Sequence, residues 1–518
     1  MKKGILILIL LILALFSVSC IYASDVNDTA IASEDTDQME LSTDDGITED
    51  NLQANNEETV SAETDSEILT DGQYTYSDLR EQIGSGGNKS LTKGAYTYKE
   101  NDGDTIQITD SGVIEGNGAI IDMAESTIRA FDVSASNVTI KNLTIINANY
   151  GGDGGAIYFG QSGTIDNCNF YNNSVGSKGG AVYFNNDGFL TNCNFIDNKA
   201  VGRYNGGAVY FNNDGFVTNC NFTNNSATSN GAAVSFGYSY GTYREVKDCN
   251  FNGNIGSNSG ALYFSGGSAN SVINCNFSDN KANYRYYNNG GAIYFDYTSG
   301  IVINCTFTNN AADAEDGEGG AIKGSDLKLF NCTFINNVAY YGGALHGGEA
   351  YNCTFINNNA NQDGGAVYKS KAYDCIFKGN GAKYGGAFYE NEAYNCTFIA
   401  NTAKEQGGAV FNGKALDCNF SENYASKEGG AMFEGTVGLC YLNTAIDTIY
   451  NTNVLPTFNV SKRALRFDLA DRLLFNFTYD NKNYDGYNTT ITLAQDGNTV
   501  GVYYALSGSD EGWAMDLN

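Results

Sequence analysis

The feature that most constrains this chain is a short phrase that recurs twelve times in its middle. Gly-Gly-Ala followed by an apolar residue, as in Gly342 to Leu345, returns every 21 to 31 residues. One Gly is replaced in two copies, at Ala232 and Ser259. Self-similarity at a fixed period is the signature of a repeat architecture, so the repeat is interpreted before any single motif.

A second phrase follows each copy of the first and is just as regular. A cysteine comes first, and a phenylalanine follows two residues after eleven of the twelve cysteines, with an asparagine three residues after each phenylalanine. The cysteines are Cys168, Cys193, Cys220, Cys249, Cys275, Cys305, Cys332, Cys353, Cys375, Cys396, Cys418 and Cys440. The phenylalanines are Phe170, Phe195, Phe222, Phe251, Phe277, Phe307, Phe334, Phe355, Phe377, Phe398 and Phe420.

These phrases predict an all-β fold. Apolar and polar residues alternate in twos within each phrase, which indicates short strands, and Gly-Gly and Asn-Asn pairs between them suit tight bends. A unit of this size cannot bury its own apolar face, so neighbouring units must stack. We therefore expect a right-handed, single-stranded parallel β-helix, in which equivalent residues lie above one another at about 4.8 Å and the cysteines and phenylalanines form inward ladders.

The same residues carry a family resemblance. Gly-Gly-Ala-Ile paired with Phe-x-x-Asn resembles the repeat of polymorphic outer-membrane proteins, and the form with a preceding cysteine resembles adhesin-like surface proteins of methanogenic archaea. The resemblance covers residues 73–518. It implies a β-helix displayed at a cell surface, and it implies little about the ligand.

The N-terminal part is expected to direct export. Residues 1–23 have two lysines, an apolar core and a small residue at Ala23, which is typical of a secretory signal peptide. Lipidation at Cys20 and an uncleaved anchor are the alternatives. Residues 24–72 contain sixteen Asp or Glu and no Lys or Arg, so we expect an acidic, disordered tether. We expect no transmembrane span once the signal is removed.

The repeats are expected to lie between two different end segments. Residues 73–150 are predicted to form the N-terminal cap and first coils, with a helix over Ser77–Ile83 and Ser77 as its N-cap. Residues 151–442 are the repeats. Residues 443–518, beginning shortly before the single proline, are predicted to form a C-terminal β segment that resembles an incomplete immunoglobulin-like domain.

Composition excludes some partners. The formal net charge is −30 and the pI is near 4.2, which disfavours nucleic acid and anionic membranes. Twelve repeated cysteines in an exported chain suggest either buried core thiols or paired disulfides, and zinc is disfavoured because no Cys-x-x-Cys occurs. We expect no cofactor and at most weak calcium binding by acidic loops such as Asp313–Glu318.

An enzyme is the second functional hypothesis. A polysaccharide lyase or hydrolase needs clustered carboxylates, but the acidic residues of the repeats are scattered, and His346, the only histidine, occupies a position held by tyrosine elsewhere. Carboxylates gathered with Lys or Arg across neighbouring coils would favour this hypothesis. The scattered residues are Asp166, Asp197, Asp248, Asp279, Asp374 and Asp417.

A row of tyrosines is the candidate ligand surface. Each follows the apolar residue after Gly-Gly-Ala, so alternation is expected to turn it outward, where an exposed aromatic stripe can stack on sugar rings. The alternative is that the rings only stack on one another. The residues are Tyr158, Tyr183, Tyr210, Tyr263, Tyr294, Tyr368 and Tyr389.

The sequence thus predicts an exported cell-surface β-helix that binds a glycan or protein ligand without turnover. A polysaccharide lyase or hydrolase and a structural envelope component are the alternatives. The ligand, the anchor, the redox state of the cysteines and the oligomeric state do not follow from the sequence.

Overall fold

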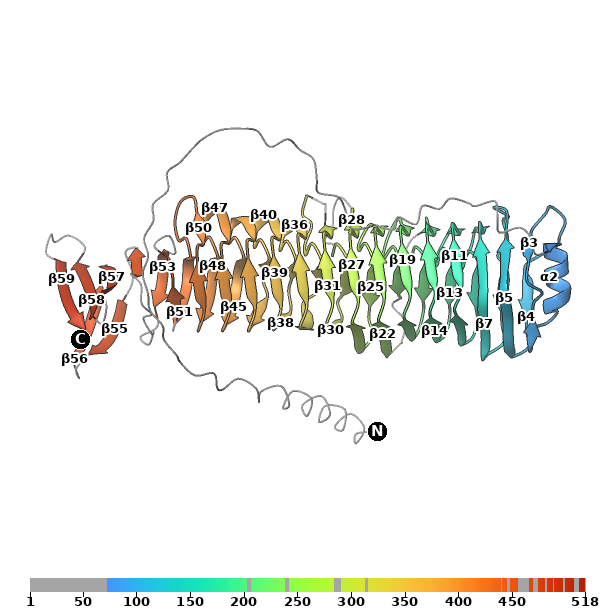
Figure 1. Cartoon of the computed structure of the whole chain (residues 1–518), viewed down its shortest axis with the longest axis horizontal. Coiled ribbons are helices and arrows are strands. Elements are labelled where there is room, and N and C mark those ends of the chain that lie inside the picture. Colours follow the sequence, from blue (N-terminus) through green and yellow to red (C-terminus); the bar gives the residue numbers. More distant parts are fainter. Residues whose placement is uncertain are drawn as a thin grey trace, which may run out of the picture. The chain divides into compact units, whose positions relative to one another are not determined.

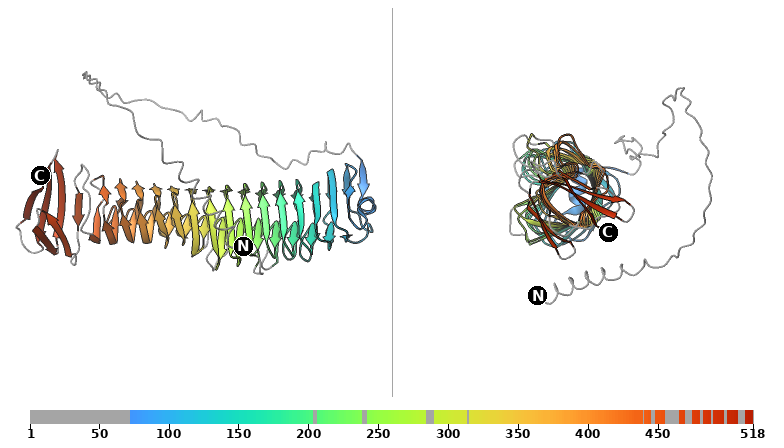
Figure 2. Two further views of the ribbon diagram at one scale, coloured as in Figure 1. Left: turned by 90° about the horizontal axis from the view of Figure 1, so that it is seen from below. Right: turned by 90° about the vertical axis from the view of Figure 1, so that its left-hand side faces the viewer.

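The computed structural model describes residues 72–202, 206–237, 242–283, 290–312, 315–438, 440–444 and 448–454, and six strands between 465 and 517. The predicted signal peptide and almost all of the predicted tether lie outside these residues. The described chain is nearly all β and forms a parallel β-solenoid of about 14 turns (Figure 1, Figure 2). The predicted β-helix fold is confirmed.

Most coils of the repeats contain four strands, which pair in parallel with the equivalent strands of the next coil. The coil that starts at Val209 shows the pattern, because Val209, Tyr210 and Phe211 pair with Val234, Ser235 and Phe236 without any shift. The first three strands of the coils belong to one 45-stranded sheet, and the short fourth strands form a separate 12-stranded sheet. Equivalent residues therefore lie in columns along the solenoid.

The strands have the following bounds. First strands are β9 (Ile157–Phe159), β13 (Val182–Phe184), β17 (Val209–Phe211), β21 (Val234–Phe236), β25 (Leu262–Ser265), β29 (Ile293–Asp296), β33 (Ile322–Lys323), β37 (Leu345–His346) and β41 (Val367–Tyr368). Second strands are β10 (Gly163–Asp166), β14 (Gly188–Thr191), β18 (Gly215–Thr218), β22 (Tyr243–Lys247), β26 (Ala269–Ile273), β30 (Ser299–Ile303), β34 (Asp326–Phe330), β38 (Glu349–Tyr351) and β42 (Lys371–Tyr373). First and second strands merge in β45 (Phe388–Tyr394), β48 (Val410–Leu416) and β51 (Met432–Gly438). Third strands are β11 (Asn169–Tyr171), β15 (Asn194–Ile196), β19 (Asn221–Thr223), β23 (Asn250–Asn252), β27 (Asn276–Ser278), β31 (Thr306–Thr308), β35 (Thr333–Ile335), β39 (Thr354–Ile356), β43 (Ile376–Lys378), β46 (Thr397–Ile399), β49 (Asn419–Ser421) and β52 (Tyr441–Leu442). Fourth strands are β8 (Asn149–Tyr150), β12 (Ser174–Val175), β16 (Lys199–Ala200), β20 (Ser226–Ala227), β24 (Ile255–Gly256), β28 (Lys281–Ala282), β32 (Ala311–Ala312), β36 (Val338–Tyr341), β40 (Asn359–Asp363), β44 (Gly381–Tyr384), β47 (Thr402–Gln406) and β50 (Tyr424–Ala425).

In the eleven repeats where Asn or Asp precedes the cysteine, that residue forms the corner between the second and third strands. Asn192 has a φ of 56° there, in the left-handed region that asparagine and aspartate tolerate better than other side chains. Asp248, Asp374 and Asp417 take the same corner with φ values of 53°, 55° and 56°. The left-handed backbone at this corner therefore explains why aspartate occurs at these three positions.

The interior is built from files of identical side chains. The phenylalanines of the third strands are buried, and consecutive rings stack with centroids 4.8–5.0 Å apart, for example Phe170 on Phe195 and Phe195 on Phe222. The asparagine three residues later is fully buried as well. Asn198 Nδ2 donates to the Phe170 carbonyl at 2.9 Å and to Asn225 Oδ1 at 3.0 Å, so its amide hydrogen bonds to the coil on either side. These asparagines therefore form a hydrogen-bonded ladder inside the solenoid.

The cysteine file consists of buried free thiols. All twelve are unpaired in the structure. Cys193 Sγ donates to the Thr191 carbonyl at 3.1 Å, and its backbone N–H donates to Cys220 Sγ at 3.4 Å. Burial raises the pKa of thiols in this file, as at Cys168 and Cys332. Of the two alternatives, buried core thiols and paired disulfides, the structure contains the buried thiols.

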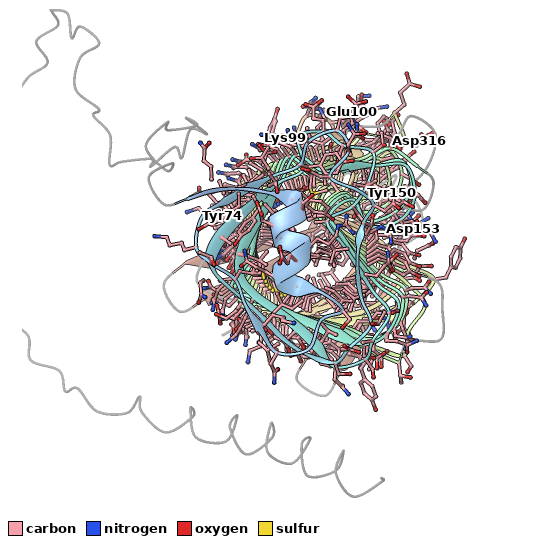
Figure 3. The ribbon with its side chains drawn as sticks, turned by 90° about the vertical axis from the view of Figure 1, so that its right-hand side faces the viewer. Tyr74, Lys99, Glu100, Tyr150, Asp153 and Asp316 are labelled. Carbon is pink, nitrogen blue, oxygen red and sulfur yellow. The ribbon has the colours of Figure 1, made fainter. Side chains whose placement is uncertain are left out.

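A short helix closes the N-terminal end of the solenoid. Strand β1 (Gln73–Thr75) leads into α2 (Tyr76–Ile83), which lies across the end of the first coils (Figure 3). The N-cap is Thr75, not Ser77: the Thr75 Oγ1 accepts from the Asp78 N–H, and the Asp78 carboxylate accepts from the Thr75 N–H at 2.7 Å. Ser77 was the wrong choice because Thr75 has the acidic partner three residues later that a capping box requires.

The first coils comprise β2 (Lys89–Ser90), β3 (Ala95–Thr97), β4 (Ile106–Ile108), β5 (Gly112–Asp122), β6 (Phe131–Val133) and β7 (Val138–Ile146). Two of these strands, β5 and β7, are longer than any strand of the repeats. Beyond β53 (Ile449–Val454) and β54 (Leu465–Asp468), pairing becomes antiparallel. The antiparallel strands are β55 (Leu474–Tyr479), β56 (Lys482–Tyr487), β57 (Thr489–Asp496), β58 (Thr499–Leu506) and β59 (Gly512–Leu517).

Candidate functional site

The seven predicted tyrosines lie in one column on the first strands. Tyr158, Tyr183 and Tyr210 are in register, and so are Tyr263 with Tyr294 and Tyr368 with Tyr389. Most rings stack nearly parallel on the next, with centroids 5.2 Å apart for Tyr158 on Tyr183 and 5.4 Å for Tyr183 on Tyr210. The column therefore exists as the sequence places it.

The expected outward exposure of this column is wrong for three of its members. Tyr183, Tyr210 and Tyr263 are only 5%, 4% and 6% exposed. Lys178 covers the Tyr210 ring at 4.7 Å, and the Tyr263 hydroxyl donates to Asp296 at 2.5 Å. Ring faces in the column are occupied by neighbouring rings, so little aromatic face remains on which a sugar can stack.

Charged residues interrupt the column at two successive coils. Lys323 and His346 are in register with each other and with Tyr368, at positions where aromatic residues otherwise stand. Glu318 bridges them, with its Oε2 2.9 Å from Lys323 Nζ and 3.5 Å from His346 Nδ1. Asp296, one coil earlier, accepts from the hydroxyls of Tyr263 and Tyr294. The structure thus gathers carboxylates and a lysine that are scattered along the sequence.

His346 packs within this column. Its side chain is 19% exposed and stacks on Tyr368 with centroids 5.1 Å apart. Burial lowers the pKa of His346 to about 4, which outweighs the opposing effect of Glu318. Burial also lowers the pKa of Lys323. The imidazole is therefore neutral at pH 7, although the groups of this cluster mainly satisfy one another.

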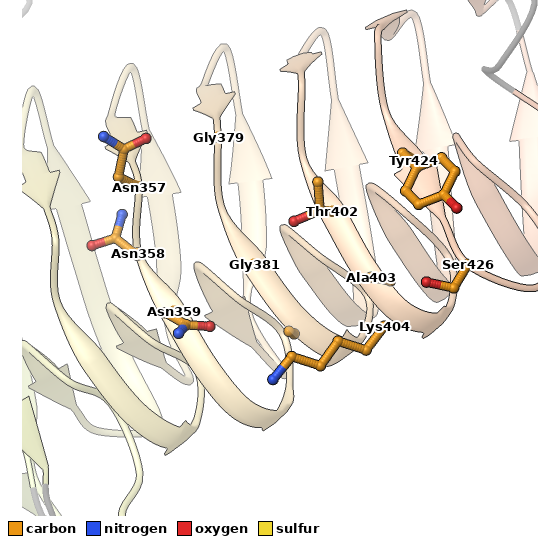
Figure 4. Close-up of a pocket in the computed structure, with 11 residues that line it drawn as sticks. Asn357, Asn358, Asn359, Gly379, Gly381, Thr402, Ala403, Lys404, Tyr424 and Ser426 are labelled. Atoms are coloured by element: carbon orange, nitrogen blue, oxygen red, sulfur yellow. The ribbon is translucent and has the colours of Figure 1, made fainter.

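A shallow groove of about 560 Å³ lies along the fourth strands of the last coils (Figure 4). Asn359, Gly381, Thr402 and Tyr424 follow one another in register across β40, β44, β47 and β50. Gly381 has no side chain where its neighbours have one, so the column is locally hollow. We call this groove the notch, and it is lined by Asn357, Asn358, Asn359, Gly379, Gly381, Ala382, Thr402, Ala403, Lys404, Tyr424 and Ser426.

Tyr424 gives the notch an aromatic wall whose ring is accessible. Its side chain is among the exposed apolar groups, at 51%. Within the described residues no other ring stacks on it, because the residue in register with it is Thr402. The amides of Asn357 and Asn359, the Thr402 hydroxyl and the Lys404 ammonium are also exposed. The notch combines one free aromatic face with several hydrogen-bonding groups.

The notch was missed by the sequence reasoning because it results from absent side chains. The usual Asn-Asn-x of the repeat reads Gly379-Asn380-Gly381 here, which looks like another bend. Gly379 does occupy a left-handed corner, with a φ of 65°. Gly381 lies within strand β44, and a Cβ built on it meets side-chain oxygens no closer than 3.5 Å. The signal in the sequence that could have revealed the notch was Gly381, because the backbone at that position does not require a glycine.

The predicted weak calcium binding falls partly outside the described residues, because residues 313 and 314 of the acidic loop Asp313–Glu318 are not among them. Among the residues that are described, no three His, Cys, Asp or Glu side chains converge as metal ligands. No helix in that part of the chain is both long enough and apolar enough to cross a membrane.

The chain is a parallel β-solenoid protein, and its coils include repeats of the polymorphic membrane protein type. The repeat of Chlamydia polymorphic membrane proteins matches residues 274–296, 304–325 and 352–370, each of which spans parts of successive coils. No curated protein matches the chain.

Several solved structures show weak likeness. Tailspike protein 3 of bacteriophage CBA120 is 12% identical over 76% of this chain, with a TM-score of 0.28, and the chain spans 58% of that protein's length. The alginate lyase AlyF-OU02, in complex with G6, is 11% identical over 81% of this chain and 92% of its own, with a TM-score of 0.29. The tailspike of E. coli bacteriophage HK620 with a hexasaccharide is 14% identical over 85% of this chain and 75% of its own, with a TM-score of 0.30. At these TM-scores no function is transferred.

Proposed function

We propose that this protein is an exported cell-surface β-helix that binds a glycan at the notch and does not turn it over. Surface display is supported by the polymorphic-membrane-protein-type repeats and by the signal-like residues 1–23. The finer resemblance to adhesin-like proteins of methanogenic archaea remains part of this proposal.

The accessible ring of Tyr424 is the observation that carries the proposal. Sugar rings have one or more apolar C–H faces and a rim of hydroxyls, so they bind where an aromatic face lies beside hydrogen-bonding groups. The tyrosine column fails this requirement because its rings stack on each other. The notch meets it, because the exposed Tyr424 ring lies one coil from Thr402, and Asn359 lines the other end of the notch.

A polysaccharide lyase is the second candidate, favoured by the cluster of Asp296, Glu318, Lys323 and His346. A neutral imidazole held by a carboxylate is suited to accept a proton, and an ammonium beside it is suited to face an acidic sugar. Against this candidate, the Lys323 ammonium already pairs with Glu318 at 2.9 Å. The Asp296 carboxylate likewise already accepts hydrogen bonds from two tyrosine hydroxyls. Binding without turnover is therefore the better-supported proposal.

The test is retention on a panel of immobilised host and microbial glycans, including polyuronates, scored together with product release and repeated with and without calcium. Retention that Tyr424→Ala abolishes supports the notch. The matched control is Tyr243→Ala, since Tyr243 is exposed to a similar extent, 55%, on β22. New unsaturated or reducing ends that depend on His346 would replace the proposal with the lyase. No retention on any glycan would favour a structural role or a protein partner.

A further inference from the structure

One carboxylate oxygen on the strand that forms the notch is buried, and no hydrogen-bond partner for it lies within the described residues. Asp363 ends β40, the strand that also carries Asn359 of the notch, and the pairing of β40 with both neighbours shifts register just before it. The side chain is 8% exposed, and within the described residues its Oδ1 atom is buried and has no hydrogen-bond partner. Such irregularities commonly re-aim a side chain beside a binding site.

Tyrosines surround this carboxylate. Tyr341 and Tyr384 are in register with Asp363 on the coils before and after it. Tyr341 also packs on Tyr368, with centroids 5.1 Å apart, and Tyr368 stacks on Tyr389 at 5.2 Å. Burial raises the pKa of Tyr341 and of Tyr389, and the charge of Asp363 adds to both rises, which places the carboxylate near both rings.

The chain already places ammonium groups on two of these rings. Lys369 Nζ lies 4.9 Å from the centroid of Tyr368, and Lys383 Nζ lies 5.0 Å from that of Tyr384. Lys369 is also 4.0 Å from Glu390. Burial and the nearby Glu390 raise the pKa of Asp363 to about 6, and Lys383 and Lys369 compensate only in part. The surface thus accepts cations and still has a carboxylate without a full partner.

We propose that Asp363 and the tyrosine rings around it bind an ammonium group of the ligand, so that the glycan held at the notch is one with free amino groups, such as a de-N-acetylated amino sugar. This inference rests on the proposed function. An ammonium satisfies a buried carboxylate and gains cation–π attraction from the rings. The net charge of −30 also attracts cationic polymers.

The distances along β40 suit a ligand that spans both sites. Asn359 and Asp363 are four residues apart on one strand, about 13 Å at the rise of a β-strand. Because Asp363 Oδ1 has no exposed surface, the ligand amine reaches it by displacing a side chain. The two lysines are long and flexible, and Lys369 is exposed, so their ammonium groups are the ones that a ligand amine replaces.

The experiment compares hexamers of glucosamine and of N-acetylglucosamine, which differ in the amino group, by calorimetry on the full exported chain. We expect the wild type to bind the amine form at least tenfold more tightly. Asp363→Asn should remove that preference and leave the binding of the acetylated form unchanged, whereas the control Glu390→Gln should alter the preference less than threefold. Lys369→Gln, which removes a competing ammonium, should tighten binding of the amine form.

The outcomes separate this inference from the proposed function. Equal binding of the two hexamers, or an equal loss of both in Asp363→Asn, would overturn the inference and leave the notch as a glycan site. Binding of neither hexamer, nor of any other glycan, would overturn both. Competition by a lysine-rich peptide but not by the glucosamine hexamer would assign the subsite to a protein partner instead. If Asp363→Asn proves unfolded by circular dichroism, the Lys369→Gln result decides, and unchanged affinity there counts against the proposal.

Discussion

Asn198 Oδ1 accepts two hydrogen bonds from Asn173, one from its backbone N–H at 3.1 Å and one from its Nδ2 at 3.0 Å. This relationship recurs in the buried asparagine file, for instance where Asn225 and Asn254 repeat it. The amide therefore replaces backbone pairing at the corner between the third and fourth strands, inside the solenoid where water is absent.

Replacing Asn198 with leucine should destabilise the solenoid by at least about 3 kcal/mol, because the Phe170 carbonyl and two donors of Asn173 lose their partner in a buried site. Chemical denaturation, together with hydrogen exchange of the Asn173 N–H, measures the effect. The control is Asn194→Ala, whose Nδ2 donates to Asn169 on the outer surface and whose loss should cost less than about 1 kcal/mol. Equal costs for the two variants would contradict the role of the buried file.

Filling the notch should abolish glycan binding without unfolding the chain. Gly381→Thr restores the column of side chains between Asn359 and Thr402, and a Cβ there makes only ordinary contacts. Glycan retention should fall at least tenfold while the melting temperature is unchanged or slightly higher, because threonine favours strands.

The matched variant is Gly379→Thr. Gly379 has a φ of 65°, and a Cβ there lies 2.4 Å from Asn357 Oδ1, so this change should lower the melting temperature. Retention that survives Gly381→Thr would show that the ligand binds elsewhere.

Stability should depend on pH through His346. Because its pKa is lowered to about 4 in the folded chain from an ordinary value near 6.5, the unfolded chain binds the proton more readily. The stabilisation is complete above pH 6.5 and is lost as the pH falls towards 4, by up to about 3 kcal/mol. His346→Phe, which matches the aromatic column, should remove this part of the pH dependence in urea titrations.

Asp363 acts with the opposite sign in part of this range. Its pKa is raised to about 6, so the folded chain holds the proton more tightly and stability falls as the pH rises from about 4 to 6. The His346 measurement is therefore made in an Asp363→Asn background. A pH profile that His346→Phe leaves unchanged would refute the assignment.

The thiol file should be inert in the folded chain. All twelve repeat thiols are buried, so an alkylating reagent does not reach their sulfur atoms in the folded chain. Iodoacetamide should modify none of the twelve repeat cysteines before unfolding and all twelve after it in urea, as counted by mass spectrometry. Rapid labelling of several native thiols, or a mass showing disulfides, would contradict the buried-thiol file.

The inward files of side chains could be predicted from the sequence, because they follow directly from the repeat. Phe170, Asn173 and Cys168 recur at fixed spacing, so their inward files follow from in-register stacking. The exposure of Tyr183 and Tyr210 could not be predicted, because alternation assigns a face of the strand but not the side chains that cover it. The notch could not be predicted because it results from the missing side chain at Gly381. The contacts of Glu318 with Lys323 and His346 could not be predicted because they depend on side-chain conformations between neighbouring coils.

The two kinds of asparagine file have opposite directions. Buried Asn173 donates from Nδ2 towards the next coil at Asn198, whereas half-buried Asn194 donates from Nδ2 towards the previous coil at Asn169. Aligned amides add their dipoles, and here the sums from the inside and the outside of the solenoid oppose each other. The two kinds of file therefore offset each other in part, and the electrical polarity of the solenoid is smaller than either kind alone would give it.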